Sequence, residues 1–109
     1  MTYRHLSEMS GGWFVGAFEP TCFRTAACEV AYKQYDRGAF EQAHVHRVAT
    51  EVTLIASGCA IMNGRMLVAG DIVVLRPGDA ADFAALEPTA TVVVKLPSVA
   101  GDKYPVGRT

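Results

Sequence analysis

The sequence has no marked excess of charge of either sign. Ten Lys and Arg stand against eleven Asp and Glu, which gives a net charge of -1, and the basic residues are scattered along the chain. Proteins that bind nucleic acids or membrane surfaces through charge concentrate their basic residues on one segment or face. The composition therefore argues against both kinds of partner.

Long apolar runs are also missing. Hydrophobic residues make up 50% of the 109 residues, yet no stretch approaches the length of a membrane span. The first twenty residues lack the charged start and apolar segment of a signal peptide. A chain of this length fits one domain with one core. We therefore expect a single domain over residues 1–109, soluble and cytoplasmic.

Cysteine is scarce. Cys22, Cys28 and Cys59 are odd in number and include no C-x-x-C pair, so neither a disulfide framework nor a cysteine zinc site is indicated. We expect reduced cysteines that pack as small apolar residues, with a reactive thiol as the alternative.

Helical periodicity is rare, whereas short β-rich runs recur between turn residues, so the chain is predicted to be all-β and antiparallel. Asn63-Gly64 predicts a two-residue type I′ hairpin turn. The core is expected over 12–96, while segments 1–11 and 97–109 should be peripheral and fray unless a partner holds them. The predicted strands are 13–18, 28–35, 43–48, 51–57, 59–62, 65–69, 71–75, 81–86 and 90–96.

Two of the three histidines stand one residue apart, in "HVHRVATE" at 44–51. Side chains alternate along a strand, so His44 and His46 should project from the same face. Glu51 lies an odd number of residues from His46 and would face the other way on an uninterrupted strand. We therefore predict that residues 47–50 bend the chain and bring Glu51 onto the next strand, facing the histidines.

Two imidazoles and a carboxylate are the ligands of the facial triad that holds non-haem Fe(II). Three protein ligands also suit catalytic Zn²⁺, and ligand type alone leaves Mn²⁺ and Ni²⁺ open. The predicted cofactor is one divalent transition-metal ion. Polar strand residues satisfied by solvent or by neighbours are the simpler alternative.

Glycines at fixed distances frame these residues. Residues 38–58 read "GAFEQAHVHRVATEVTLIASG": Gly38, five residues, His44-x-His46, four residues, Glu51, six residues, Gly58. This spacing resembles the first motif of the cupin superfamily at all its marked positions.

A second cupin-like stretch follows after a linker. "GDIVVLRPGDAADF" at 70–83 resembles the second motif in Gly70, Pro77-Gly78 and Phe83. The resemblance implies an antiparallel double-stranded β-helix, a small jelly-roll barrel of the RmlC-like type, with a metal inside its mouth. It also implies a homodimer and a small-molecule ligand or substrate.

The second motif departs from the family at one ligand position. The family pattern has a histidine at position 81, where this chain has Ala81, and Arg76 replaces the usual proline. Three explanations compete: Asp82, or less readily Asp79, supplies a carboxylate; the metal keeps three protein ligands; or the site binds no metal. Alternation places Asp82 on the face opposite to Ala81 unless the strand carries a bulge.

Polar residues on the strand at 28–35 are candidates for lining a ligand pocket. Lys33 and Tyr35 share one face and Gln34 occupies the other, and the sequence leaves open which face is internal. Any of the three could bind a carboxylate or hydroxyl group of a ligand, although exposed strand faces carry such residues too.

Two classes of function follow. The first is a metal-dependent enzyme on a small substrate, with dioxygenase chemistry for Fe(II) and isomerase or lyase chemistry for another divalent ion. The second is a non-catalytic cupin that binds or senses a sugar, nucleotide-sugar or other metabolite, which the missing histidine at position 81 favours. The resemblance to cupins also leaves open a sugar isomerase or epimerase that lacks a metal, because some cupin relatives use His and Tyr acid/base pairs. The residues indicate no general acid or base and no second catalytic residue at a recognisable spacing.

Overall fold

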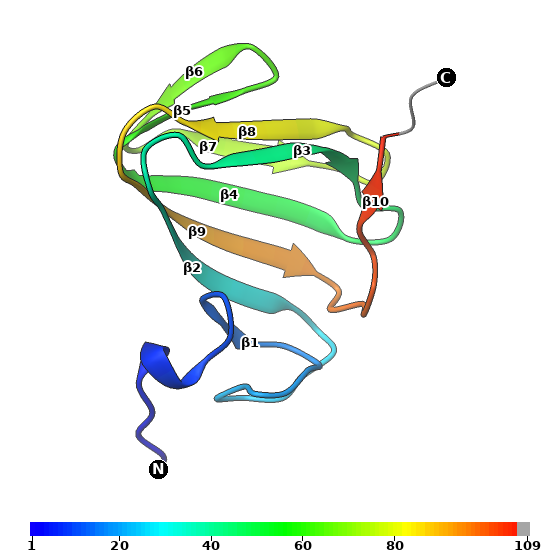
Figure 1. Ribbon diagram of the computed structural model, residues 1–109. Coiled ribbons are helices and arrows are strands. Elements are labelled where there is room, and N and C mark those ends of the chain that lie inside the picture. The colour runs from blue at the N-terminus through cyan, green and yellow to red at the C-terminus, as the bar shows by residue number, and fades with distance from the viewer. Residues whose placement is uncertain (107–109) are drawn as a thin grey trace.

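The structure, a computed structural model, describes residues 1–106, and its regular secondary structure consists almost entirely of antiparallel strands (Figure 1). This confirms the all-β prediction. Residues 107–109, at the end of the predicted tail, lie outside the described residues. The elements in chain order are the 3-10 helix η1 (Leu6–Glu8) and strands β1 (Trp13–Val15), β2 (Glu29–Tyr35), β3 (Phe40–Val45), β4 (Thr50–Ser57), β5 (Cys59–Met62), β6 (Arg65–Val68), β7 (Ile72–Leu75), β8 (Ala81–Ala85), β9 (Thr89–Leu96) and β10 (Tyr104–Pro105).

The strands form two five-stranded sheets. The first has the order β1-β2-β9-β4-β7 and the second the order β10-β3-β8-β5-β6. They face one another in Figure 1, with β10 beside the end of β3. Among the described strands the two sheets stay separate, so the predicted barrel is an open pair of sheets and is not closed by hydrogen bonds.

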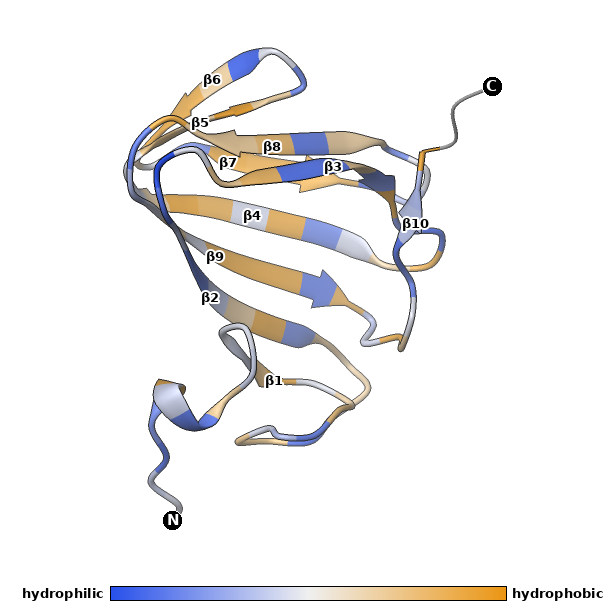
Figure 2. Cartoon of the chain, viewed as in Figure 1, coloured by the Kyte–Doolittle hydropathy of each residue, from blue (hydrophilic) through white to orange (hydrophobic). Residues whose placement is uncertain are grey.

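Apolar side chains from both sheets meet between them. Figure 2 shows apolar residues along most of β4 and β9, with hydrophilic residues toward the start of β2 and β4 and the end of β9. These hydrophilic positions lie at the same end of the first sheet, which separates an apolar end of the interior from a polar one. The buried core cluster consists of Ile55, Ala60, Met62, Leu67, Leu75, Ala81, Phe83 and Ala85.

The predicted hairpin turn is confirmed. Asn63 and Gly64 have φ values of 50° and 77°, as a type I′ turn requires, and they connect β5 to β6 in register. Gly58, from the first cupin-like motif, also has a positive φ, and a Cβ there would lie 2.4 Å from the Pro88 carbonyl oxygen. Only glycine fits this corner between β4 and β5.

The predicted strand bounds hold within one or two residues except at two places. Strand β1 ends at Val15, and a Cβ at Gly16 would overlap the Phe18 ring. Strand β3 begins at Phe40 and ends at Val45, so His46 lies just beyond it.

The described part of the C-terminal tail is held in place, which is the condition under which the prediction does not expect it to fray. Tyr104 and Pro105 pair with β3, and Asp102 is only 3% exposed. The partner that holds this segment is the chain itself.

Within residues 1–106, no helix has the length and apolar character needed to cross a membrane. The three cysteines form no disulfide, and Cys22 is exposed.

Candidate metal centre

His44 and His46 come together at the end of β3. The pairing of β3 with β8 shifts between Glu41 and His44, and His44 then lies opposite Ala81. The two imidazole rings meet edge to face with centroids 5.3 Å apart. The expectation that both histidines project to the same side is confirmed, although only His44 belongs to the strand.

The chain bends directly after His46, as predicted. Residues 46–49 are outside any strand, and β4 starts at Thr50. Glu51 then faces back toward the histidines, and one ligand atom from each of His44, His46 and Glu51 lies within 4.8 Å of the others. We call these three residues the His-His-Glu cluster.

Both imidazoles have one ring nitrogen engaged by a backbone carbonyl. His44 Nδ1 lies 3.1 Å from the Gln42 carbonyl oxygen, and His46 Nδ1 contacts the Asp102 carbonyl oxygen. A carbonyl can only accept, so each Nδ1 carries the proton and donates. This tautomer leaves Nε2 as the nitrogen that can bind a metal.

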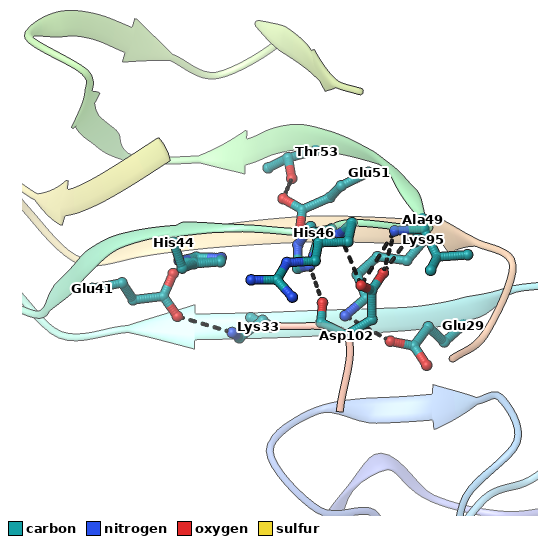
Figure 3. A network of polar contacts seen from close by, with 12 residues as sticks. Glu29, Lys33, Glu41, His44, His46, Ala49, Glu51, Thr53, Lys95 and Asp102 are labelled. Carbon is teal, nitrogen blue, oxygen red and sulfur yellow. Dashed lines mark hydrogen bonds and ion pairs between the residues drawn. The ribbon is translucent and has the colours of Figure 1, made fainter. Parts of the chain in front are cut away.

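The Glu51 carboxylate is held by two side chains. Oε1 lies 2.9 Å from His46 Nε2, and Oε2 accepts a hydrogen bond of 2.9 Å from the Thr53 hydroxyl (Figure 3). Burial acts to raise the pKa of Glu51, but the hydrogen bonds from His46 and Thr53 outweigh it, and the pKa lies below its usual value. Glu51 is therefore a carboxylate at neutral pH.

The hydrogen bond that His46 donates to Glu51 raises the pKa of His46 against the opposing effect of burial. In the absence of an ion, a proton on Nε2 bridges His46 to Glu51. A divalent cation at this place would substitute for that proton, which makes metal affinity dependent on pH.

Asp102 fastens the bend to the C-terminal segment. Its carboxylate accepts backbone hydrogen bonds from Arg47 at 2.8 Å, Val48 at 3.2 Å and Ala49 at 2.9 Å (Figure 3). Burial acts to raise the pKa of Asp102, but the hydrogen bonds from these N–H groups have the larger, opposite effect. The pKa of Asp102 therefore lies below its usual value. One residue thus holds both the turn and, through its carbonyl oxygen, the His46 ring.

Position 81, where the family motif has its last histidine, lies beside the cluster. Ala81 is 3% exposed, faces the interior and pairs with His44 across β3 and β8. The Asp82 carboxylate instead accepts a 2.7 Å hydrogen bond from the Asn63 backbone, and Asp79 caps the turn at Arg76. The structure does not bring either aspartate into the His-His-Glu cluster.

A cavity of about 430 Å³ opens between the sheets beside the cluster. Of the sequence candidates for its wall, Lys33 and Tyr35 line it, while Gln34 is exposed on the opposite face. The Tyr35 ring packs on Phe83 with centroids 4.7 Å apart. Burial raises the pKa of Tyr35, so the phenol keeps its proton at neutral pH.

A buried ion pair lies next to the cluster on the first sheet. Lys95 Nζ is 2.8 Å from Glu29 Oε1, and the Ser98 hydroxyl donates to Glu29 Oε2 at 2.7 Å. Lys95 stands opposite Glu29 on one side and Glu51 on the other. This row of alternating charges crosses β2, β9 and β4.

Two imidazole nitrogens and a carboxylate oxygen that converge on one point suit a divalent transition metal, and they match the facial-triad donor set. The donors are preoriented by Gln42, Asp102 and Thr53, as outer hydrogen bonds usually orient metal ligands. The cluster therefore fits such an ion.

No protein-family model and no curated protein matches the sequence. Solved structures do match. A Klebsiella pneumoniae protein with a double-stranded β-helix domain shares 27% identity over 77% of this chain and 74% of its own, with a TM-score of 0.69. KdgF from Halomonas shares 24% over 69% and 74% of the two chains, with a TM-score of 0.63. The DMSP lyase DddQ from Ruegeria pomeroyi shares 21%, with a TM-score of 0.69, and this chain spans about half of it.

The fold and these neighbours define a double-stranded β-helix protein. The protein has the architecture of a small cupin, as the two sequence motifs had indicated.

Sequence reasoning missed Thr53 and Asp102, which hold the cluster, and the ion pair of Glu29 and Lys95, which lies beside it. Thr53 follows Glu51 by two residues on the same face, and Lys95 is a charge at an inward position of an apolar strand, so both had a periodicity signal. Asp102 had none, because its role depends on the path of the tail.

Proposed function

We propose that His44, His46 and Glu51 bind one divalent transition-metal ion and that the protein is a metal-dependent enzyme on a small molecule. The convergence of the three ligand atoms within 4.8 Å, at the wall of a cavity, supports this proposal. A bound divalent ion supplies Lewis acidity that polarises a carbonyl or hydroxyl group of a substrate.

The chain's own residues supply binding, orientation and proton handling. Leu75, Phe83 and Val93 give the inner part of the cavity apolar walls. Tyr35 presents a protonated phenol and Lys33 an ammonium to the same space. Both can donate a hydrogen bond or a proton to a substrate oxygen.

These proton-bearing groups favour isomerase or lyase chemistry, which depends on proton transfer. Dioxygenase chemistry depends instead on a binding site for molecular oxygen. Iron in the purified protein together with oxygen uptake would favour the dioxygenase class instead. The fold is compatible with lyase activity, since DddQ is a lyase, and an oxalate decarboxylase from Bacillus subtilis shares 17% identity with a TM-score of 0.64.

The decisive experiment is elemental analysis of purified wild type beside a His44→Ala/His46→Ala double variant. We expect about one transition-metal ion per wild-type chain and none in the variant. A chelator should lower the melting temperature of the wild type only, since an ion that binds the folded state stabilises it. Equal metal content in both proteins would refute the site.

The small side chain at position 81 favours a second function, a non-catalytic cupin that binds a metabolite. Ala81 lies beside His44 without contributing a ligand. This alternative predicts that a ligand raises the melting temperature without turnover. Any reproducible product that depends on His44 excludes it.

A further inference from the structure

We propose that Lys33 and Lys95, together with Trp13, form a subsite for the carboxylate group of a small organic acid. The proposal deepens the proposed function, on which it rests, by naming the substrate class of the same cavity.

Both lysines face the cavity although they come from different strands. Lys33 is on β2 and Lys95 on β9, and each belongs to the inward-facing set of its strand. Their side chains are only 24% and 11% exposed. Ammonium groups are rarely buried to this degree unless they have partners, so the partners of these two lysines decide what else the subsite can bind.

The two ammonium groups approach one aromatic ring. Lys33 Nζ lies 5.9 Å and Lys95 Nζ 5.3 Å from the centroid of Trp13, within the range of a cation–π contact. The indole therefore brings two positive charges from separate strands to one part of the cavity.

Protein carboxylates pair with both ammonium groups but do not use all of their hydrogen-bond donors. Lys95 pairs with Glu29 at 2.8 Å and Lys33 with Glu41 at 3.2 Å. Each ammonium has three N–H donors, and each has one carboxylate partner among the described residues. Each ammonium group therefore has further N–H donors that can bind an oxygen atom of a ligand.

The same two carboxylates limit which anion fits. Glu29 and Glu41 would repel a phosphate dianion more strongly than a carboxylate, which carries a single negative charge. A cavity of about 430 Å³ is in the lower part of the range for small-molecule sites. Together these features select a small monocarboxylic acid.

The subsite also places such an acid next to the metal ligands. Lys95 pairs with Glu51 across β9 and β4, and directly opposed residues have Cβ atoms roughly 5 Å apart. An acid held at Lys95 by its carboxylate therefore extends along Glu51 toward the His-His-Glu cluster.

Trp13 is the single tryptophan of the chain, so its fluorescence reports on this subsite alone. The probes are 4-hydroxybutanoate and its amide, which are matched in size and differ in charge. Both are titrated into the full-length protein, with and without Zn²⁺, while Trp13 fluorescence is followed. We expect the acid to bind about tenfold more tightly than the amide in both states, as expected for hydrogen bonds to a charged group.

The variant Lys33→Met should weaken binding of the acid about tenfold and leave binding of the amide unchanged. Arg65→Gln, which removes an exposed charge on β6, is the matched control and should change neither. Because Lys95→Met alone would leave Glu29 buried without its partner, Lys95 is tested as Glu29→Gln/Lys95→Met, which should also abolish the preference for the acid.

Equal affinity for acid and amide, or a preference for the acid that survives both lysine variants, would overturn the subsite. Tighter binding of methyl phosphate than of the acid would overturn the carboxylate assignment. Zinc content, measured on each sample, separates the two proposals. A preference for the acid in protein that takes up no zinc supports the subsite and refutes the metal function, whereas zinc uptake without the preference refutes the subsite alone.

Discussion

Asp102 and His46 are 56 positions apart in the chain, yet the Asp102 carbonyl oxygen accepts the Nδ1 hydrogen of His46. The carboxylate of the same residue accepts the backbone N–H groups that follow His46. The C-terminal segment thus fixes both the ring and the bend of the candidate metal centre.

Replacing Asp102 should therefore weaken metal binding without removing a ligand. In Asp102→Asn the three N–H groups of the bend lose a charged acceptor, and such bonds contribute about 1.5–3 kcal/mol each. We expect the zinc Kd to rise roughly tenfold, as for other outer-sphere partners, and the melting temperature to fall by roughly 5 °C or more.

The control for this prediction is Asp71→Asn, which removes a comparable carboxylate that accepts from the Val68 backbone, away from the cluster. It should lower the melting temperature slightly and leave the zinc Kd unchanged. An unchanged zinc Kd in Asp102→Asn would show that the tail does not position His46.

The contribution of Asp102 to stability should depend on pH in the acid range. The pKa of Asp102 is depressed below its ordinary value of 3.8, so its contribution is fully present above pH 3.8 and is lost as the pH falls further. Urea unfolding of metal-free wild type and Asp102→Asn should show a constant difference in unfolding free energy above about pH 5 that shrinks below about pH 4. A difference that grows on acidification would contradict this assignment.

A histidine at position 81 should complete the ligand set. Ala81 faces the interior directly opposite His44, and the cavity beside it has room for a larger side chain. We expect Ala81→His to tighten zinc binding about tenfold or more, measured by competition with a chelator, because a fourth protein ligand suits tetrahedral Zn²⁺. Ala84→His, on the outward face of the same strand, should leave zinc affinity unchanged. Equal zinc affinities of the two variants would refute position 81 as the place of a fourth ligand.

Thr53 should influence the metal through Glu51. Thr53→Val keeps the shape of the side chain but removes the hydroxyl that donates to Glu51 Oε2, so we expect the zinc Kd to rise several-fold to about tenfold. Thr91→Val is the matched control, since the buried Thr91 hydroxyl has no hydrogen-bond partner among the described residues. It should leave the Kd unchanged and stabilise the protein by about 1 kcal/mol in urea unfolding. A similar loss of metal affinity in both variants would assign the effect to packing.

Local patterns in the sequence were enough to predict most of the fold. Short β-rich runs between turn residues located the strands, and Asn63-Gly64 fixed a hairpin, because positive φ angles are cheap only for such residues. The alternation of side chains along a strand placed His44 and His46 on one side and required a bend before Glu51, and the structure brings all three together. These features depend on neighbours in the chain, so the sequence carries them directly.

Tertiary structure decided the rest. Alternation alone left open which face of the strand at 28–35 is internal, and the packing of the sheets turned Lys33 and Tyr35 inward and Gln34 outward. The tail looked peripheral because its residues favour turns, yet Asp102 is buried against a bend more than fifty residues away. Such contacts depend on how distant segments meet in space, which no local pattern records. The sequence determined the candidate ligands, and the fold determined what holds them in place.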